Sequence, residues 1–256
     1  MSMKVVSIIG QKGGCGKTSI TIMLASTLAY KYGKNVVALD CDTYQQSMSQ
    51  CRVDDIEMIK PYERENENGE KEMMVEQYTM YNAFIQQQKK MYEIVKCSED
   101  VNAIMDVLDK READGAEYVF LDLPGHVANE DNFKIVSLCD VVFVPFTVSK
   151  FVFSSNYSFA KTVHDKVLPA DCQLNEMYGF WNRYDASLRQ QLYAKLNEKL
   201  ATDLPNMKML NNKIAETSAF ENEKCKSTIL PPFAQQWKYG NIGETLTEMC
   251  NIIMKE

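Results

Sequence analysis

The chain has 256 residues and a net charge of −7, and 45% of its residues are hydrophobic. This composition predicts one globular domain over residues 1–256, and the short apolar runs exclude a membrane-spanning class. The acidic balance disfavours bulk attraction to DNA or anionic lipid but leaves a local basic patch open. The first residues enter a strand pattern without a signal peptide, so we expect a cytoplasmic protein.

Short β-branched runs alternate with helical patterns along the chain, which is typical of a mostly parallel sheet flanked by helices. Strands are expected at 5–9, 35–42, 91–95, 117–125, 140–146, 176–182 and 208–210. Helices are expected at 19–33, 72–91, 99–112, 153–167, 185–200 and 242–254, with a polar surface loop at 62–72. The sequence therefore predicts a doubly wound α/β fold that carries a helical insertion at about 50–95.

The segment GQKGGCGKTS at 10–19 lies between the first expected strand and the first expected helix. In that position backbone N–H groups and the helix N-terminus can bind phosphate. Lys17 is expected to reach the β- and γ-phosphates and Thr18 to bind Mg²⁺, although a glycine-rich turn beside an unrelated lysine is the alternative. The nucleotide-binding residues predicted from this segment are Gly13, Gly14, Cys15, Gly16, Lys17, Thr18 and Ser19.

A phosphate loop also needs an acidic residue that organises the magnesium ion. The apolar run YVFLDLPG places Asp122 at the end of a buried strand, followed by a Pro-Gly turn. An aspartate in this position holds Mg²⁺, often through a water molecule. An aspartate that only starts a turn is the alternative, and the phosphate loop earlier in the chain favours the magnesium role.

The loop departs from the common pattern G-x-x-x-x-G-K-[ST], because Gln11 stands where the first glycine is usual and Lys12 follows it. In this respect QKGGCGKTS resembles the deviant Walker A motif, K-G-G-x-G-K-[ST], of the ParA/MinD family of P-loop ATPases. The resemblance implies ATP as the nucleotide. It also implies that Lys12 contacts the phosphates bound by the other subunit of a homodimer and stabilises charge there, as an arginine finger does.

Two further segments extend the resemblance. VVALDCD resembles the second family motif, a strand that ends in D-x-D; this implies that Asp42 orients the hydrolytic water and that Asp40 supports the magnesium ion. Relatives often continue with proline, whereas Thr43 follows here. GFWNRYD resembles a strand that ends in Asn-Arg, which implies that Asn182 contacts the adenine, since an amide can donate and accept. A place in a turn before a helix is the alternative for Asn182.

The turn ILPPF resembles the segment that closes over the base, which implies a contact from Pro231. The segments LDCDTYQQS, FLDLPGHV, SSNYSFA and STILPPF resemble ParA-like ATPases of conjugative transposons and other mobile elements. In the family, an ATP-bound homodimer binds a surface and a partner protein triggers hydrolysis. DNA is that surface for partition proteins and the membrane is that surface for MinD-like proteins.

Four classes of function remain to be weighed. The C-terminal helix has an apolar face but an acidic opposite face, so we expect it to pack on the sheet and expect no membrane binding. Nonspecific double-stranded DNA is a candidate partner, with the nucleoid as a candidate location, but the C-terminal lysines Lys213, Lys224 and Lys226 are scattered among acidic residues. An iron–sulfur protein is disfavoured, because the segments around Cys97 and Cys139 lack a glycine-rich cluster loop and the eight cysteines form no C-x-x-C pair.

A nucleotide-gated adaptor that binds a protein through residues 50–95, without a DNA surface, is the main alternative. The preferred interpretation is an Mg²⁺-dependent ParA-type ATPase, weak and stimulated by an unidentified protein partner, that acts in DNA partition or in the maintenance and transfer of a mobile element. Lys12, Lys17 and Asp42 are the predicted catalytic residues, and Thr18, Asp40 and Asp122 are the predicted metal-site residues.

Overall fold

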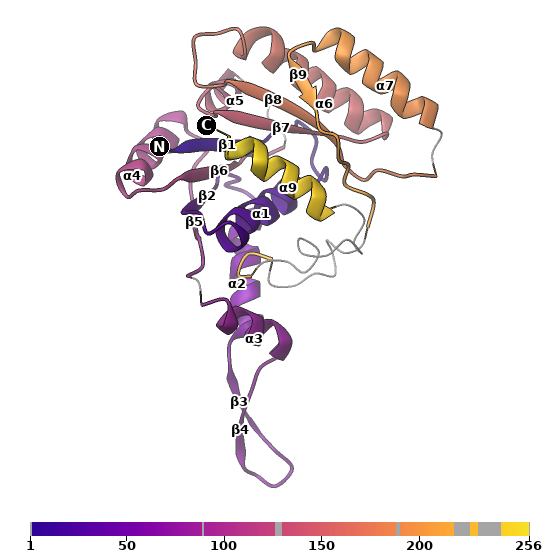
Figure 1. Cartoon of the computed structure of the whole chain (residues 1–256). Helices are drawn as coiled ribbons and strands as arrows, with labels where there is room; N and C mark the ends of the chain where they lie inside the picture. The colour runs from indigo at the N-terminus through magenta and orange to yellow at the C-terminus, as the bar shows by residue number, and fades with distance from the viewer. Residues whose placement is uncertain are drawn as a thin grey trace.

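The computed structural model describes residues 2–88, 90–125, 130–187, 190–217, 226–229 and 242–255. Within them, seven strands form one parallel sheet in the order β5-β2-β6-β1-β7-β8-β9 (Figure 1). The strands are β1 (Lys4–Ile8), β2 (Val36–Asp40), β5 (Glu93–Lys96), β6 (Tyr118–Asp122), β7 (Val141–Phe146), β8 (Glu176–Trp181) and β9 (Met207–Met209). Each of these strands was expected from the sequence, and the expected doubly wound fold is confirmed.

Helices cover both faces of the sheet because each buried strand sends alternate apolar side chains to opposite sides. In β1, Val6 and Ile8 join the core cluster beneath α1 and α9, whereas Val5 joins the cluster on the other face. The helices are α1 (Lys17–Ser26), α4 (Val101–Ala113), α5 (Glu130–Val136), α6 (Lys150–Thr162), α7 (Gln190–Asp203) and α9 (Ile242–Ile253). Two π-helical turns, η1 (Thr27–Lys31) and η2 (Val163–Val167), extend α1 and α6.

The expected helical insertion at 50–95 is wrong in part. It begins with a helix, α2 (Ser47–Ile59), but continues as an antiparallel hairpin of β3 (Tyr62–Glu65) and β4 (Lys71–Met74), which projects away from the sheet (Figure 1). The helix expected from residue 72 is α3 (Tyr78–Gln86). The turn explains the difference, because Asn66 N–H bonds to Glu70 O and Gly69 adopts a φ of 77° that favours glycine.

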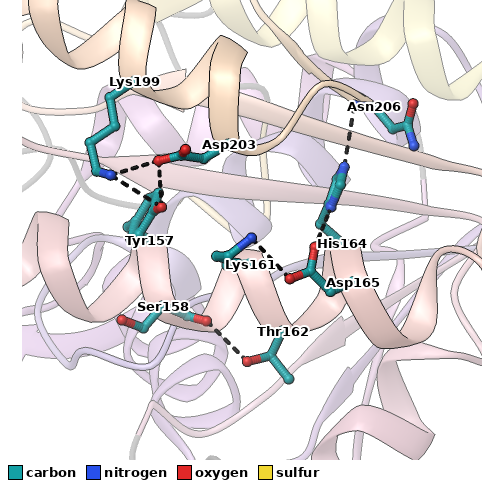
Figure 2. Close-up of polar contacts among 9 residues, drawn as sticks. All are labelled: Tyr157, Ser158, Lys161, Thr162, His164, Asp165, Lys199, Asp203 and Asn206. Carbon is teal, nitrogen blue, oxygen red and sulfur yellow. Dashed lines mark hydrogen bonds and ion pairs between the residues drawn. The ribbon is translucent and has the colours of Figure 1, made fainter.

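Polar side chains join α6 to α7 on one face of the sheet (Figure 2). The hydroxyl of Tyr157 donates to an Asp203 carboxylate oxygen at 2.6 Å, and Lys199 Nζ lies 2.6 Å from the same oxygen. A second set ties the end of α6 and η2 to the turn after α7, and it consists of Lys161, His164, Asp165 and Asn206. These contacts fix α6, the helix that supports the glycine loop described below.

The C-terminal helix α9 packs on the sheet, as expected from its apolar face. Its buried side chains Leu246, Met249 and Ile253 belong to the core cluster that also contains α1. Among the described residues, no helix has both the length and the apolar character that crossing a bilayer requires.

Candidate functional site

The glycine loop has the backbone conformation that a phosphate site requires. Gly14 and Gly16 have φ values of 73° and 86°, in the left-handed region where a side chain is disfavoured. Gly16 immediately precedes α1, so the first N–H groups of that helix open onto the loop. Backbone N–H groups at a helix N-terminus attract anions, and the aligned peptide dipoles add to that attraction.

The loop is held from behind by Asn156 of α6, a residue that the sequence analysis missed. Its side chain is fully buried; Oδ1 accepts from the N–H of Lys12 at 3.3 Å, and Nδ2 donates to Pro145 O at 2.8 Å. The thiol of Cys15 donates to Lys12 O at 3.1 Å. The N–H and the C=O of Lys12 are therefore both hydrogen-bonded, whereas its side chain is exposed. Asn156 lies in the segment SSNYSFA, which carries part of the family resemblance, but that resemblance assigned no role to the residue.

The Pro-Gly turn after β6 lies against the same loop. A Cβ atom placed on Gly125 would lie 2.7 Å from Lys17 Nζ and 3.1 Å from the backbone nitrogen of Gly13. A larger residue at position 125 would therefore displace the Lys17 ammonium group or push against the glycine loop. The side chain of Lys17 is buried, as expected for a group that reaches into a phosphate site rather than into solvent.

Two buried carboxylates lie at the ends of neighbouring strands. Asp40 of β2 is the register partner of Asp122 of β6, and each is 1% exposed. Asp122 lies close enough to Thr18, the second residue of α1, for that side chain to lower the pKa of the carboxyl group. One oxygen of Asp40 accepts from the N–H of Ser49 at 2.8 Å, but Oδ1 of each aspartate has no hydrogen-bond partner among the described residues.

The pKa of Asp122 is raised to about 7, chiefly by burial and also by the nearby Asp40 carboxylate, whereas Thr18 and Lys17 lower it. Two orphaned carboxylate oxygens beside a threonine hydroxyl fit Mg²⁺, which binds few protein ligands and retains waters or phosphate oxygens. No group of three or more His, Cys, Asp or Glu side chains that could hold a metal occurs among the described residues. The arrangement therefore fits a metal shared with phosphate rather than a site made of protein ligands alone.

Asp42 organises the loop that follows β2. Its Oδ1 accepts from the N–H groups of Tyr44 at 3.2 Å and Gln45 at 3.0 Å, and its backbone oxygen accepts from Gln46 N–H. Aspartate side chains commonly form such turns. Thr43 occupies the position where relatives often have proline. The turn made by Asp42 gives the loop a fixed geometry without that proline. The Asp42 carboxylate faces the phosphate cavity.

That cavity has a volume of about 570 Å³, within the range of small-molecule sites. The glycine loop and the N-terminus of α1 form one side, and the loop after β2 with α2 forms the other. Its polar lining residues include Lys12, Lys17, Thr18, Ser19, Asp42 and Lys226. The structure thus gathers the predicted phosphate-binding residues, and it places Lys226 in this cavity rather than on a surface for DNA.

A second cavity of about 230 Å³ adjoins the first and shares Gly16 and Ser19 with it. Asn182 lines it, and its Nδ2 donates to Cys15 O at 2.8 Å while its Oδ1 accepts from Arg183 N–H at 2.9 Å. A Cβ atom on Gly16 would lie 2.8 Å from Asn182 Nδ2. Asn182 therefore supports the glycine loop directly, and its second amide hydrogen remains for a base in the adjoining cavity.

A buried polar cluster joins α2 to the short segment 226–229. Asp55 accepts from the N–H of Ser227 at 2.8 Å and from its hydroxyl at 2.6 Å. Arg52 donates to Ser227 O at 2.8 Å and to Tyr92 O at 2.8 Å. The sequence did not predict this cluster, because Asp55 and Ser227 lie 172 residues apart in the chain. It fixes the backbone beside Lys226.

Some sequence-based expectations fall elsewhere. Pro231 lies outside the described residues, as does Lys224. Cys139 is fully buried in the turn between α5 and β7, and Cys97 lies close to the buried thiol of Cys41. The burial of Cys139 leaves its thiol inaccessible to a cluster held between subunits. Lys213 stacks on the ring of Tyr184, with Nζ 4.3 Å from the ring centre.

Comparison with protein families gives one match, to the CobQ/CobB/MinD/ParA nucleotide-binding domain over residues 6–231. Solved structures share the fold at low sequence identity. The MinC–MinD cell division protein complex of Aquifex aeolicus aligns with a TM-score of 0.62 and 14% identity, covering 99% of this chain and 96% of that one.

Two other solved structures align similarly. An ATP complex of McdA from Cyanothece gives a TM-score of 0.58 at 13% identity, with 98% and 95% of the two chains covered. The pNOB8 ParA bound to nonspecific DNA gives 0.56 at 18% identity, with 98% and 97% covered. No match was found among curated proteins.

Proposed function

The chain belongs to the CobQ/CobB/MinD/ParA family of nucleotide-binding domains, and on that premise we propose that it is a dimerising, Mg²⁺-dependent ATPase of the ParA type. The observation that carries the proposal is that the Thr18 side chain lies beside the buried Asp122 carboxylate at the N-terminus of α1. Thr18 also lines the phosphate cavity. An aspartate that only stabilises a turn is expected to have hydrogen-bond partners for its buried oxygens. Oδ1 of Asp122 has none among the described residues.

In the proposed reaction, water attacks the γ-phosphate in line and the bond to the bridging oxygen of ADP breaks, which yields ADP and phosphate. Lys17 and the loop N–H groups bind the β- and γ-phosphates. Thr18 and Asp122 hold Mg²⁺, with Asp40 behind them, and the ion neutralises phosphate charge when it is bound. Asp42, in the loop that faces the cavity, orients the attacking water.

Lys12 is proposed to act on the nucleotide of a second subunit. Its backbone is fixed by Asn156 and Cys15, but its side chain is exposed at the mouth of the cavity. An exposed lysine on a rigid backbone is suited to reach across an interface, because little further ordering of the main chain is needed. Lys17, in contrast, is buried and acts within its own subunit.

The test compares Lys12→Ala with Lys17→Ala in ATP binding, sedimentation velocity and phosphate release. Lys17→Ala should lose productive Mg²⁺-ATP binding, whereas Lys12→Ala should retain it but lose ATP-induced dimerisation or turnover. Tight Mg²⁺-ATP binding by the Lys17 variant would count against the site. Unchanged dimerisation and turnover in the Lys12 variant would remove the role across the interface.

The proposal extends to a switch on DNA, in partition or in the maintenance or transfer of a mobile element. It rests on the family and on the sequence resemblance, since the acidic chain offers little positive charge. Anisotropy of labelled duplex DNA, titrated with Asp42→Ala protein in ATP or in ADP, tests it. Tight, salt-sensitive binding in ATP alone supports the switch. Equal binding in both nucleotides favours the second candidate, an ATP-gated protein adaptor, for which the projecting hairpin is the specific observation.

A further inference from the structure

The β3–β4 hairpin has surface features that folding does not explain. All eight of its strand residues are exposed. Tyr62 and Met73 are 46% and 64% exposed, and neither belongs to a hydrophobic cluster formed by the described residues. A two-stranded hairpin alone is marginally stable in water, so large apolar side chains on it indicate a contact that is made with something else.

The outer edge of β3 is open for pairing. The bond from Asn66 N–H to Glu70 O sets the hydrogen-bonded positions of the ladder, and these alternate along antiparallel strands. The pairs Arg64–Glu72 and Tyr62–Met74 are therefore hydrogen-bonded within the hairpin. The N–H and C=O groups of Glu63 and Glu65 then point away from β4, toward the free edge. In the described sheet topology β3 pairs with β4 alone.

The charge of the hairpin selects among possible occupants. Residues 62–74 contain five glutamates and two basic residues, a net charge of −3. DNA and anionic membranes would be repelled, and so would the hairpin of a second copy of this chain. Glu63 pairs with Lys71 at 3.0 Å, but both side chains are more than half exposed, so this ion pair is weak and easily exchanged.

We propose that β3 is the docking edge for an extended, basic segment of a partner protein, which adds to the hairpin as a third strand. The side chains of Glu63 and Glu65 lie on one face, so the added strand carries Lys or Arg at the two alternate positions opposite them. On the other face of the ribbon, an apolar side chain lies opposite Tyr62, at the position next to the one opposite Glu63. Main-chain hydrogen bonds to Glu63 and Glu65 supply affinity, and the alternating charge supplies specificity.

Charged residues on a free edge also protect proteins against aggregation, and this is the competing explanation. It accounts for the glutamates but not for the exposed Tyr62 and Met73 on the same ribbon. If the glutamates only prevent aggregation, a charge reversal should have the same effect on peptide binding wherever it is made in the hairpin. If β3 is a docking edge, a reversal on that edge should weaken binding of a basic strand more than a reversal in the turn. The two explanations therefore differ in what a single charge reversal does.

The test measures anisotropy of fluorescein-labelled Lys-Val-Lys-Val-Lys-Val-Lys with the full chain, without nucleotide, so that it does not depend on the proposed ATPase. Glu-Val-Glu-Val-Glu-Val-Glu is the control peptide. Glu65→Lys changes the edge, and Glu67→Lys makes the same charge change in the turn. We expect Glu65→Lys to weaken binding by about fivefold or more and Glu67→Lys by less than about twofold, because opposed charge pairs across strands contribute up to ~1 kcal/mol each.

Two further variants separate the backbone from the charge. Glu65→Gln removes only the charge, whereas Glu65→Pro also removes the outward N–H and leaves the ladder to β4 intact. Binding should fall further with proline than with glutamine, and the basic peptide should slow hydrogen exchange of the Glu63 and Glu65 amides. Absence of binding, equal effects of the Glu65 and Glu67 reversals, or a hairpin-dependent dimer in sedimentation would each overturn the proposal.

Discussion

Replacing Asp122 with asparagine should stabilise the nucleotide-free protein at pH 8 while removing Mg²⁺-ATP binding. Burial raises the pKa of Asp122 from 3.8 to about 7. Because each tenfold change in ionisation is worth about 1.4 kcal/mol, the ionised carboxylate costs the folded state up to about 4 kcal/mol. An asparagine carries no charge, keeps an oxygen for Thr18 and can donate to the unpartnered Oδ1 of Asp40.

The sign of the pH dependence follows from the direction of this shift. The folded protein binds the Asp122 proton more tightly than the unfolded chain does. The stability from this group is therefore fully present below pH ~4 and is lost as the pH rises toward 7. The gain from Asp122→Asn should accordingly be about 2–4 kcal/mol at pH 8 and clearly smaller at pH 5.

Urea unfolding in EDTA at the two pH values measures both gains, with the exposed Asp109→Asn as the control. The control should change the free energy of unfolding by less than about 0.5 kcal/mol at either pH. If Asp122→Asn destabilises the protein, or changes its stability equally at pH 5 and pH 8, the carboxylate is not held at an energetic cost and the reasoning is refuted.

Two other substitutions test the supports of the site. Asn156→Ala should cost about 2 kcal/mol of stability and weaken ATP binding, since it leaves the N–H of Lys12 and the carbonyl of Pro145 without their partner. The exposed Ser154→Ala on the same helix is the control, and equal ATP affinity in both variants would separate Asn156 from the loop. Asp55→Ala should cost about 2–3 kcal/mol, because it leaves the buried N–H and hydroxyl of Ser227 without their acceptor, as urea unfolding will show. The double variant with Arg52→Ala should cost less than the sum of the two single changes, because both side chains bond to Ser227; an additive loss would mean that the two residues are not coupled.

The sheet and the phosphate loop could be predicted from sequence because their signals are local. Buried parallel strands are continuous apolar runs, and the glycines mark left-handed backbone at Gly14 and Gly16. Asp122 could be predicted as a metal-site residue because it ends a buried apolar strand of a chain that also carries a phosphate loop. Asp40 was assigned only through the resemblance to the family motif.

The supports of the site could not be predicted in this way. Asn156, Arg52 and Asp55 act through contacts with residues far away in the chain, and no local spacing marks such pairs. The hairpin was mistaken for a loop and the start of a helix because its strands are short and polar on both faces. Period-two alternation is visible only when one face is buried. Contacts between distant parts of the chain determine these features, and a local pattern does not show such contacts.

The buried cluster around Ser227 has a thermodynamic consequence. Arg52 and Asp55 come from α2, Gln87 after α3 donates to Thr228 O at 2.8 Å, and the same segment sets Lys226 in the phosphate cavity. The segment 226–229 thus supports both the helices that flank the hairpin and one side of the phosphate cavity. If occupancy of one site shifts that support, reciprocity requires that each ligand change the affinity of the other by the same factor. Binding of a basic strand to the hairpin would then change the affinity of the cavity for nucleotide, and nucleotide binding would change the affinity of the hairpin for the strand.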